Sequence, residues 1–74
     1  MAQRERLIDA TLCVDAKGAG ALFALSDRQW RQLNTMGQVP EPRKIGAAVR
    51  WPLAELAAWL EAGCPDRAAW EAMR

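Results

Sequence analysis

The side chains of this 74-residue chain that could do chemistry are mostly arginines and lysines, and they gather in the middle of the sequence. Residues 26–50 hold five cations against two acids, a net charge of +3, whereas residues 1–25 are neutral and residues 51–74 carry −2. Lys and Arg that neutralise phosphates supply most non-specific DNA affinity, so the pattern indicates a nucleic-acid contact. The alternative is that these charges are the solvated faces of a small domain. The five cations are Arg28, Arg31, Arg43, Lys44 and Arg50.

The remaining polar residues offer little for catalysis or metal binding. The chain has no histidine, which removes the commonest general base and the commonest metal ligand. Two cysteines without histidine do not make a zinc site within one chain. Glu55, Glu61 and Glu71 fit ordinary charges on helix surfaces, and no pair of carboxylates is placed for acid–base work. We therefore expect no enzyme activity, no metal, no cofactor and no small-molecule substrate.

Composition predicts one small globular domain. Half of the residues are hydrophobic and about a quarter are charged, which does not fit a disordered chain. No apolar run approaches the roughly 20 residues that span a bilayer, and the N-terminal apolar patch is too short for a signal peptide. We therefore expect a cytoplasmic protein without membrane contact, in which Cys13 and Cys64 are reduced thiols. The four tryptophans are expected in the core, as their spacing in helices and a hairpin suggests.

Two short helices are predicted before the first proline. Asp15 is a candidate N-cap for a helix that reaches about Phe23, although Gly18 and Gly20 each cost about 1 kcal/mol relative to alanine. Ser26 begins a second helix, over 27–36, and Gln29 three residues later completes a capping box. Gly37 is the natural stop for this helix. Its apolar stripe is expected to comprise Leu25, Trp30, Leu33 and Met36.

The second half of the chain predicts a hairpin and two more helices. The segment 43–51 reads as a hairpin, with Ile45, Val49 and Trp51 pointing inward and Lys44 and Arg50 pointing outward. A helix over 53–62 follows, whose amphipathic face holds Leu53, Leu56, Trp59 and Leu60. Asp66 then caps a short final helix. The expected organisation is an arm over 1–12, a domain over 13–62 and a helical extension over 63–74.

The order helix, helix, hairpin, helix is that of a mostly α winged helix-turn-helix. In such a fold the second helix enters the major groove of double-stranded DNA, and the hairpin lies along the adjacent backbone. Arginine pairs with guanine through two hydrogen bonds, and Gln or Asn pairs with adenine. We predict base or phosphate contacts from the second helix and phosphate contacts from the hairpin. The predicted DNA-binding residues are Ser26, Asp27, Arg28, Gln29, Arg31, Gln32, Thr35, Arg43, Lys44 and Arg50.

Residues 12–60 resemble the winged-helix domains of the AlpA and excisionase families, which are related to the MerR-type head. The resemblance rests on the Ser26 to Gly37 helix, the extended 39–42 segment with its two prolines, the 43–46 wing, the 49–51 strand and the 56–60 helix end. It implies a DNA-binding transcriptional regulator, or an excisionase-like factor of a prophage or mobile element. The sequence does not choose between these two roles.

The chain also departs from that family pattern. Gly18 and Gly20 replace an acidic residue and an alanine, Ala24 replaces a glycine, and Gln32 stands where arginine is frequent. Ala47 and Ala48 replace wing-tip positions that are often basic, which removes two phosphate contacts. Two copies on adjacent half-sites are one way to regain affinity. The rival hypothesis is a protein-interaction module that keeps the fold without DNA binding, with Trp70 as part of its partner-facing surface.

Overall fold

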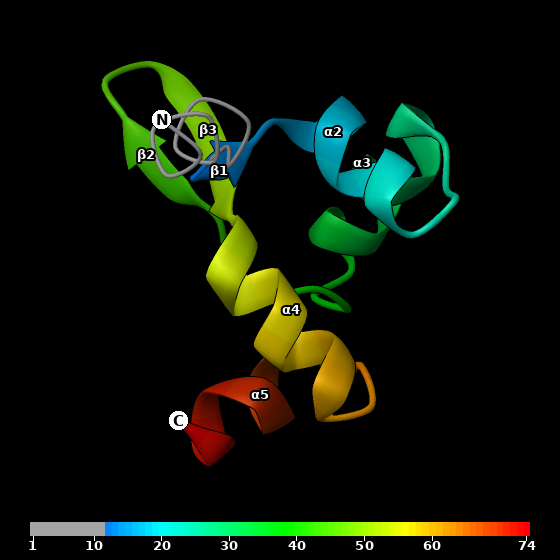
Figure 1. The fold of residues 1–74 in the computed structure, drawn as a ribbon, viewed down its shortest axis with the longest axis vertical. Helices are drawn as coiled ribbons and strands as arrows, with labels where there is room; N and C mark the ends of the chain where they lie inside the picture. Colours follow the sequence, from blue (N-terminus) through cyan, green and yellow to red (C-terminus); the bar gives the residue numbers. More distant parts are fainter. Residues whose placement is uncertain (1–11) are drawn as a thin grey trace, which may run out of the picture.

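The computed structural model describes residues 12–74, and these residues form four helices and a three-stranded antiparallel sheet (Figure 1). Most of the described residues in regular structure are helical. The predicted N-terminal arm over 1–12 lies, apart from Leu12, outside the described residues. The elements are β1 (Cys13–Val14), α2 (Ala16–Leu22), α3 (Asp27–Thr35), β2 (Arg43–Ile45), β3 (Ala48–Pro52), α4 (Leu53–Glu61) and α5 (Arg67–Met73).

Side-chain caps fix where three of the helices begin, at the residues that the sequence predicted. Asp15 accepts a hydrogen bond from the Gly18 amide at 2.8 Å, and Asp66 accepts one from the Ala69 amide at 2.8 Å. Ser26 and Gln29 form the complete capping box, with bonds of 3.0 and 2.8 Å. Each cap satisfies amide groups that the first turn of a helix leaves without partners.

Helices α2, α3 and α4 end in the same way, with a left-handed residue at the second position beyond the helix. That residue is Gly37 after α3 and Gly63 after α4, but Ala24, at φ 60°, after α2. In each case the amide of this residue donates a hydrogen bond to the carbonyl three residues before it. The amide of the following residue donates to the carbonyl five residues before that following residue. This is the hydrogen-bond pattern of a Schellman motif. The left-handed conformation strains a residue that carries a Cβ atom.

We therefore expect Ala24→Gly to raise the free energy of unfolding by about 1 kcal/mol, because it removes the left-handed strain. Ala24 is exposed, so the change deletes no core contact. The matched control is Ala62→Gly, at the exposed C-cap of α4, where φ is −81°. That control is expected to destabilise the fold. Urea denaturation followed by tryptophan fluorescence measures both variants, and equal destabilisation by both contradicts the assignment of strain to Ala24.

The sheet has the order β1-β3-β2, with β3 in the centre. The predicted hairpin is confirmed, since Arg43 lies opposite Arg50 and Ile45 lies opposite Ala48. The sequence analysis missed β1, which pairs Cys13 with Pro52 and Val14 with Trp51. The inward position predicted for Ile45 is wrong, because its side chain is 61% exposed. Strand β2 is an edge strand with all its residues exposed, and no buried layer covers it.

The core is built around the four tryptophans, all of which are buried as predicted. Trp30 is fully buried, stacks on Phe23 at 5.5 Å between ring centroids and meets Trp51 and Trp59 edge-on. Edge-on and offset ring pairs of this kind add to the free energy gained by burial. Two predicted core members, Met36 and Leu60, are instead 63% and 55% exposed. Met36 is the C-cap residue of α3, and Leu60 faces outward beside α2.

Three indole N–H groups donate to partners between six and 15 positions away in the chain. Trp51 donates to the Pro40 carbonyl at 2.8 Å, and Trp59 donates to the Pro65 carbonyl at 2.7 Å. The buried Trp70 donates to Glu55 at 2.8 Å. Residues 63–74, predicted as a short helical extension, contact the rest of the described structure through the bonds of Trp59 and Trp70. The burial of Trp70 also removes it from any partner-facing surface.

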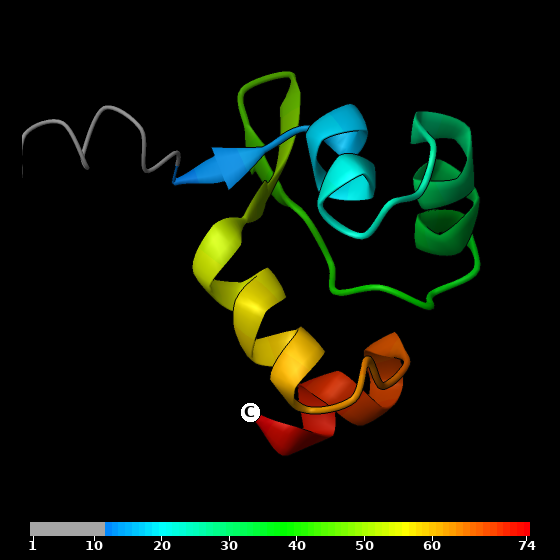
Figure 2. The same cartoon turned by 45° about the vertical axis from the view of Figure 1, so that its right-hand side comes forward.

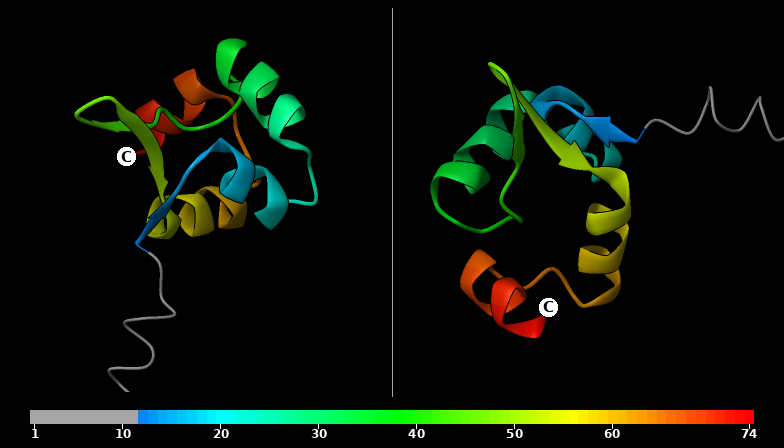
Figure 3. Two further views of the ribbon diagram at one scale, coloured as in Figure 1. Left: turned by 90° about the horizontal axis from the view of Figure 1, so that it is seen from above. Right: turned by 90° about the vertical axis from the view of Figure 1, so that its left-hand side faces the viewer.

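The hairpin, α2 and α3 follow one another across the upper half of the molecule, and α4 and α5 lie below them (Figure 2). From the side, the tip of the hairpin projects beyond the helices (Figure 3, right). No helix within residues 12–74 has both the length and the apolar character that crossing a bilayer requires.

Candidate nucleic-acid interface

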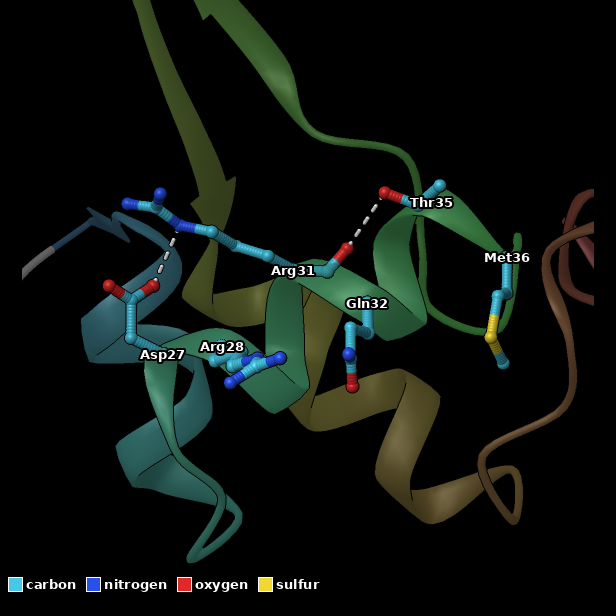
Figure 4. Close-up of a pocket in the computed structure, with 6 residues that line it drawn as sticks. All are labelled: Asp27, Arg28, Arg31, Gln32, Thr35 and Met36. Atoms are coloured by element: carbon cyan, nitrogen blue, oxygen red, sulfur yellow. Dashed lines mark hydrogen bonds and ion pairs between the residues drawn. The ribbon is translucent and has the colours of Figure 1, made fainter.

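Helix α3 divides its residues between the core and the outer surface. Trp30 is fully buried and Leu33 packs against the core. The other side of the helix lines an open hollow at the molecular surface (Figure 4). The residues that line it are Asp27, Arg28, Arg31, Gln32, Thr35 and Met36. Apart from Met36 these are all predicted DNA-binding residues, so the structure brings five of the predicted residues together on one surface, whereas Ser26 and Gln29 do not line it.

One ion pair lies within this surface. Arg31 Nε is 2.8 Å from Asp27 Oδ1, one helical turn away, while the Arg31 side chain remains 70% exposed. The Thr35 hydroxyl donates to the Arg31 carbonyl at 3.0 Å, so this hydroxyl is turned back onto the helix (Figure 4). Arg28 and Gln32 are exposed, and Arg28 has no ion-pair partner among residues 12–74.

The capping box already uses two of the predicted contact residues. Ser26 Oγ accepts the Gln29 amide, and Gln29 Oε1 accepts the Ser26 amide. Their acceptor atoms therefore hold the start of α3 in place. The Gln29 side-chain amide nitrogen keeps its donor hydrogens for another partner.

A second hollow lies between α3 and the hairpin. Arg31 and Asn34 line it from α3, and residues 47–51 line it from the hairpin side. Arg31 therefore borders both hollows. On the hairpin, Lys44 is exposed and has no ion-pair partner among the described residues. Arg50 is half-buried, and its Nη1 donates to the Val49 carbonyl at 2.8 Å.

Arg43, the remaining predicted phosphate contact, points to a carboxylate. Its Nη2 lies 3.4 Å from Glu55 Oε1, and its Nη1 donates to the Glu41 carbonyl at 3.3 Å. Glu55 was predicted to be an ordinary surface charge, which is wrong, because its side chain is only 9% exposed. It also accepts from Trp70 and pairs with Arg74. Glu55 thus joins the hairpin, α4 and α5.

We expect Glu55→Gln to lower the free energy of unfolding by about 1 kcal/mol, since glutamine can still accept from Trp70 but loses the charge that two arginines face. The same change should release Arg43 from its carboxylate. Glu61→Gln, an exposed change on the same helix, is the matched control and is expected to stay within about 0.5 kcal/mol of the wild type. Thermal unfolding followed by circular dichroism compares the two. Equal stabilities contradict a structural role for Glu55.

Arg67 is a further residue that the sequence analysis did not single out. Its guanidinium donates to the Val39 carbonyl at 3.1 Å and to the Asn34 side chain at 2.6 Å. Its own amide donates to the Gly37 carbonyl at 2.9 Å. These bonds fix the end of α3 against α5. No local sequence signal predicts them, because the partners lie about 30 residues apart.

The described residues hold no group of three His, Cys, Asp or Glu side chains that could bind a metal ion. Comparison with protein-family models, with curated proteins and with solved structures gave no match to this chain.

Proposed function

We propose that this protein is a winged helix-turn-helix that binds double-stranded DNA with sequence preference. Helices α2 and α3 are its helix-turn-helix, and the β2–β3 hairpin is its wing. The observation that carries the proposal is the two-sided character of α3. One side is anchored in the core through Trp30, and the other presents Arg28, Arg31 and Gln32 on an open surface. These are the side chains that pair with guanine and adenine edges.

In the proposed complex, α3 lies in the major groove and the wing lies along the neighbouring backbone. Lys44 and Arg50 are the wing residues proposed to contact phosphates. Arg43 contributes only if it exchanges its contact with Glu55 for a phosphate. Because so few cations face the duplex, we propose that two copies bind adjacent half-sites to gain affinity. The role is that of a transcriptional regulator or an excisionase-like factor, working in the cytoplasm.

One observation favours the alternative of a protein-interaction module. An apolar hollow lies between α2 and α4, lined by Phe23, Leu53 and Leu56 at its base. Leu22 and Leu60 border it, and each is 55% exposed. Exposed apolar surface of this kind can bind another protein. The two functions differ in their response to salt, since phosphate contacts weaken steeply with added salt and an apolar interface does not.

Selection from a random duplex library at about 150 mM salt tests the proposal, since this ionic strength screens weak surface attraction. The expected result is an enriched motif, and a paired motif indicates two bound copies. Binding of the selected duplex should then fall linearly on a plot of log affinity against log salt. Absence of both enrichment and salt-dependent binding contradicts the proposed function and favours the protein-interaction module.

Lys44→Ala is expected to weaken binding to all duplexes alike and to reduce the salt slope by about one unit, because one phosphate contact is lost. Lys44→Arg is the matched control, which keeps the charge and should keep the slope. Fluorescence anisotropy titrations between about 50 and 200 mM salt measure both slopes, a range over which phosphate contacts change affinity strongly. A slope that Lys44→Ala leaves unchanged removes Lys44 from the interface.

A further inference from the structure

Within the α3 surface, the Arg31 guanidinium is the cationic group that is paired with a carboxylate of the same helix. Its Nε lies 2.8 Å from Asp27 Oδ1, and that oxygen is closed to solvent without a directed hydrogen bond from any described residue. The ion pair with Arg31 therefore offsets the free-energy cost of burying this carboxylate oxygen. Figure 4 shows the two terminal nitrogens of Arg31 beyond the contact, on the side away from the helix axis. Since the side chain is 70% exposed, these nitrogens remain open to a ligand.

A guanidinium held through Nε presents its two terminal NH₂ groups as a planar fork. Such a fork matches a pair of acceptors that lie side by side, and fixing it in advance lowers the entropy lost on binding. In the major groove only guanine presents two acceptors on one base, N7 and O6. This fork fits the N7 and O6 pair of a guanine edge, and in shape it also fits the two free oxygens of a phosphate.

Resting on the proposed function, we propose that Arg31 reads one guanine in the major groove through N7 and O6, and that Asp27 is the residue that positions it. The neighbouring carboxylate also repels backbone phosphates, which directs Arg31 to the bases. Arg28 lies on the same surface with no ion-pair partner among residues 12–74, so no neighbouring carboxylate directs its guanidinium, which suits a contact with a backbone phosphate.

Base analogues in the selected duplex test which atoms are read. Replacing each guanine in turn by 7-deazaguanine removes N7, and at one position this should lower wild-type affinity roughly tenfold. Replacing the same guanine by inosine removes only the minor-groove amino group and should leave the affinity unchanged. If no position is sensitive to 7-deazaguanine, or if the loss follows inosine instead, the inference is wrong.

Two variants then assign the contact to residues. Arg31→Lys keeps the charge but not the fork, so it should lose the 7-deazaguanine effect while keeping salt-dependent binding. Asp27→Ala should lower the preference for guanine at that position about threefold or more, because the Arg31 guanidinium is then no longer positioned in advance. The affinity for unrelated duplexes should stay the same or increase. Glu61→Ala, which removes one exposed carboxylate at the end of α4, is the control for net charge.

The outcomes separate this inference from the proposal on which it rests. A wild-type protein that shows no salt-dependent duplex binding overturns both. If the wild type binds a selected motif but Asp27→Ala and Arg31→Lys leave its guanine preference unchanged, the protein is still a DNA-binding protein. In that case only the assignment of Arg31 as the guanine-contacting residue is wrong. Circular dichroism of each variant confirms that α3 is still folded, so that a lost preference is not a lost helix.

Discussion

The double variant Arg28→Ala/Arg31→Ala is expected to lose the motif that the wild type selects. An arginine contact to a base is worth about 1–3 kcal/mol, so the loss of the Arg31 contact should cost roughly 5-fold to 150-fold in affinity for the selected duplex, and the loss of the Arg28 contact adds to it. Both side chains are exposed on α3. Because Arg31→Ala also removes the partner of the buried Asp27 Oδ1, circular dichroism of the double variant checks that the fold is retained. Parallel selections with wild type and variant, followed by titrations on the wild-type motif, measure the loss.

The control for charge is Arg28→Lys/Arg31→Lys. It should retain salt-dependent binding because the charges remain, but it should lose much of the preference because an ammonium lacks the planar fork. The single change Arg28→Ala distinguishes two roles for that residue. A loss confined to certain base pairs indicates base readout, whereas an equal loss on every duplex indicates a phosphate contact. A double alanine variant that still selects the wild-type motif contradicts the placement of α3 in the groove.

The variant Gly20→Ala is expected to destabilise the fold by about 2–3 kcal/mol, since overpacking a tight site forces backbone shifts. Helix propensity alone predicts the reverse, because alanine is about 1 kcal/mol better than glycine inside a helix. In the structure, a Cβ atom at Gly20 would lie 2.9 Å from the carbonyl oxygens of both Leu25 and Ser26. These are backbone atoms in the turn between α2 and α3, which cannot rotate away as a flexible side chain can.

The matched control for Gly20→Ala is Ala21→Gly, at the next and exposed position of α2. It should cost about 1 kcal/mol through helix propensity without any steric effect on the turn. Because the displaced turn carries the Ser26 cap of α3, Gly20→Ala should also weaken DNA binding, whereas Ala21→Gly should not. Urea denaturation and anisotropy titrations on both variants check this. Stabilisation by Gly20→Ala contradicts the close approach of the two helices.

Local sequence determined where the helices begin and end. Asp15, Ser26 and Asp66 predicted three N-caps, and Gly37 predicted a helix end, all of which the structure confirms. These signals work because a cap or a left-handed residue satisfies groups only three to five positions away. The sequence also predicted that the tryptophans are buried, because large aromatic residues in so small a chain have few other places to pack.

The exposure of individual apolar residues was decided by the tertiary structure. Ile45, Met36 and Leu60 fit apolar patterns in the sequence, yet all three are more than half exposed. Periodicity gives the face of a helix or strand but not how far the neighbouring layer extends over it. Strand β2 is an edge strand with no covering layer, and both Met36 and Leu60 lie near helix ends.

The roles of the charged residues also depend partly on the sequence and partly on the tertiary structure. The sequence by itself determined that the cations concentrate in residues 26–50 and that two of them, Arg28 and Arg31, lie on the helix that follows Ser26. Only the tertiary structure decided which of them have protein partners: Glu55 faces Arg43 and Arg74, and Arg67 binds Asn34 across the fold. A hydrogen bond between residues 20 or 30 positions apart depends on how the helices pack, and no local pattern encodes that packing.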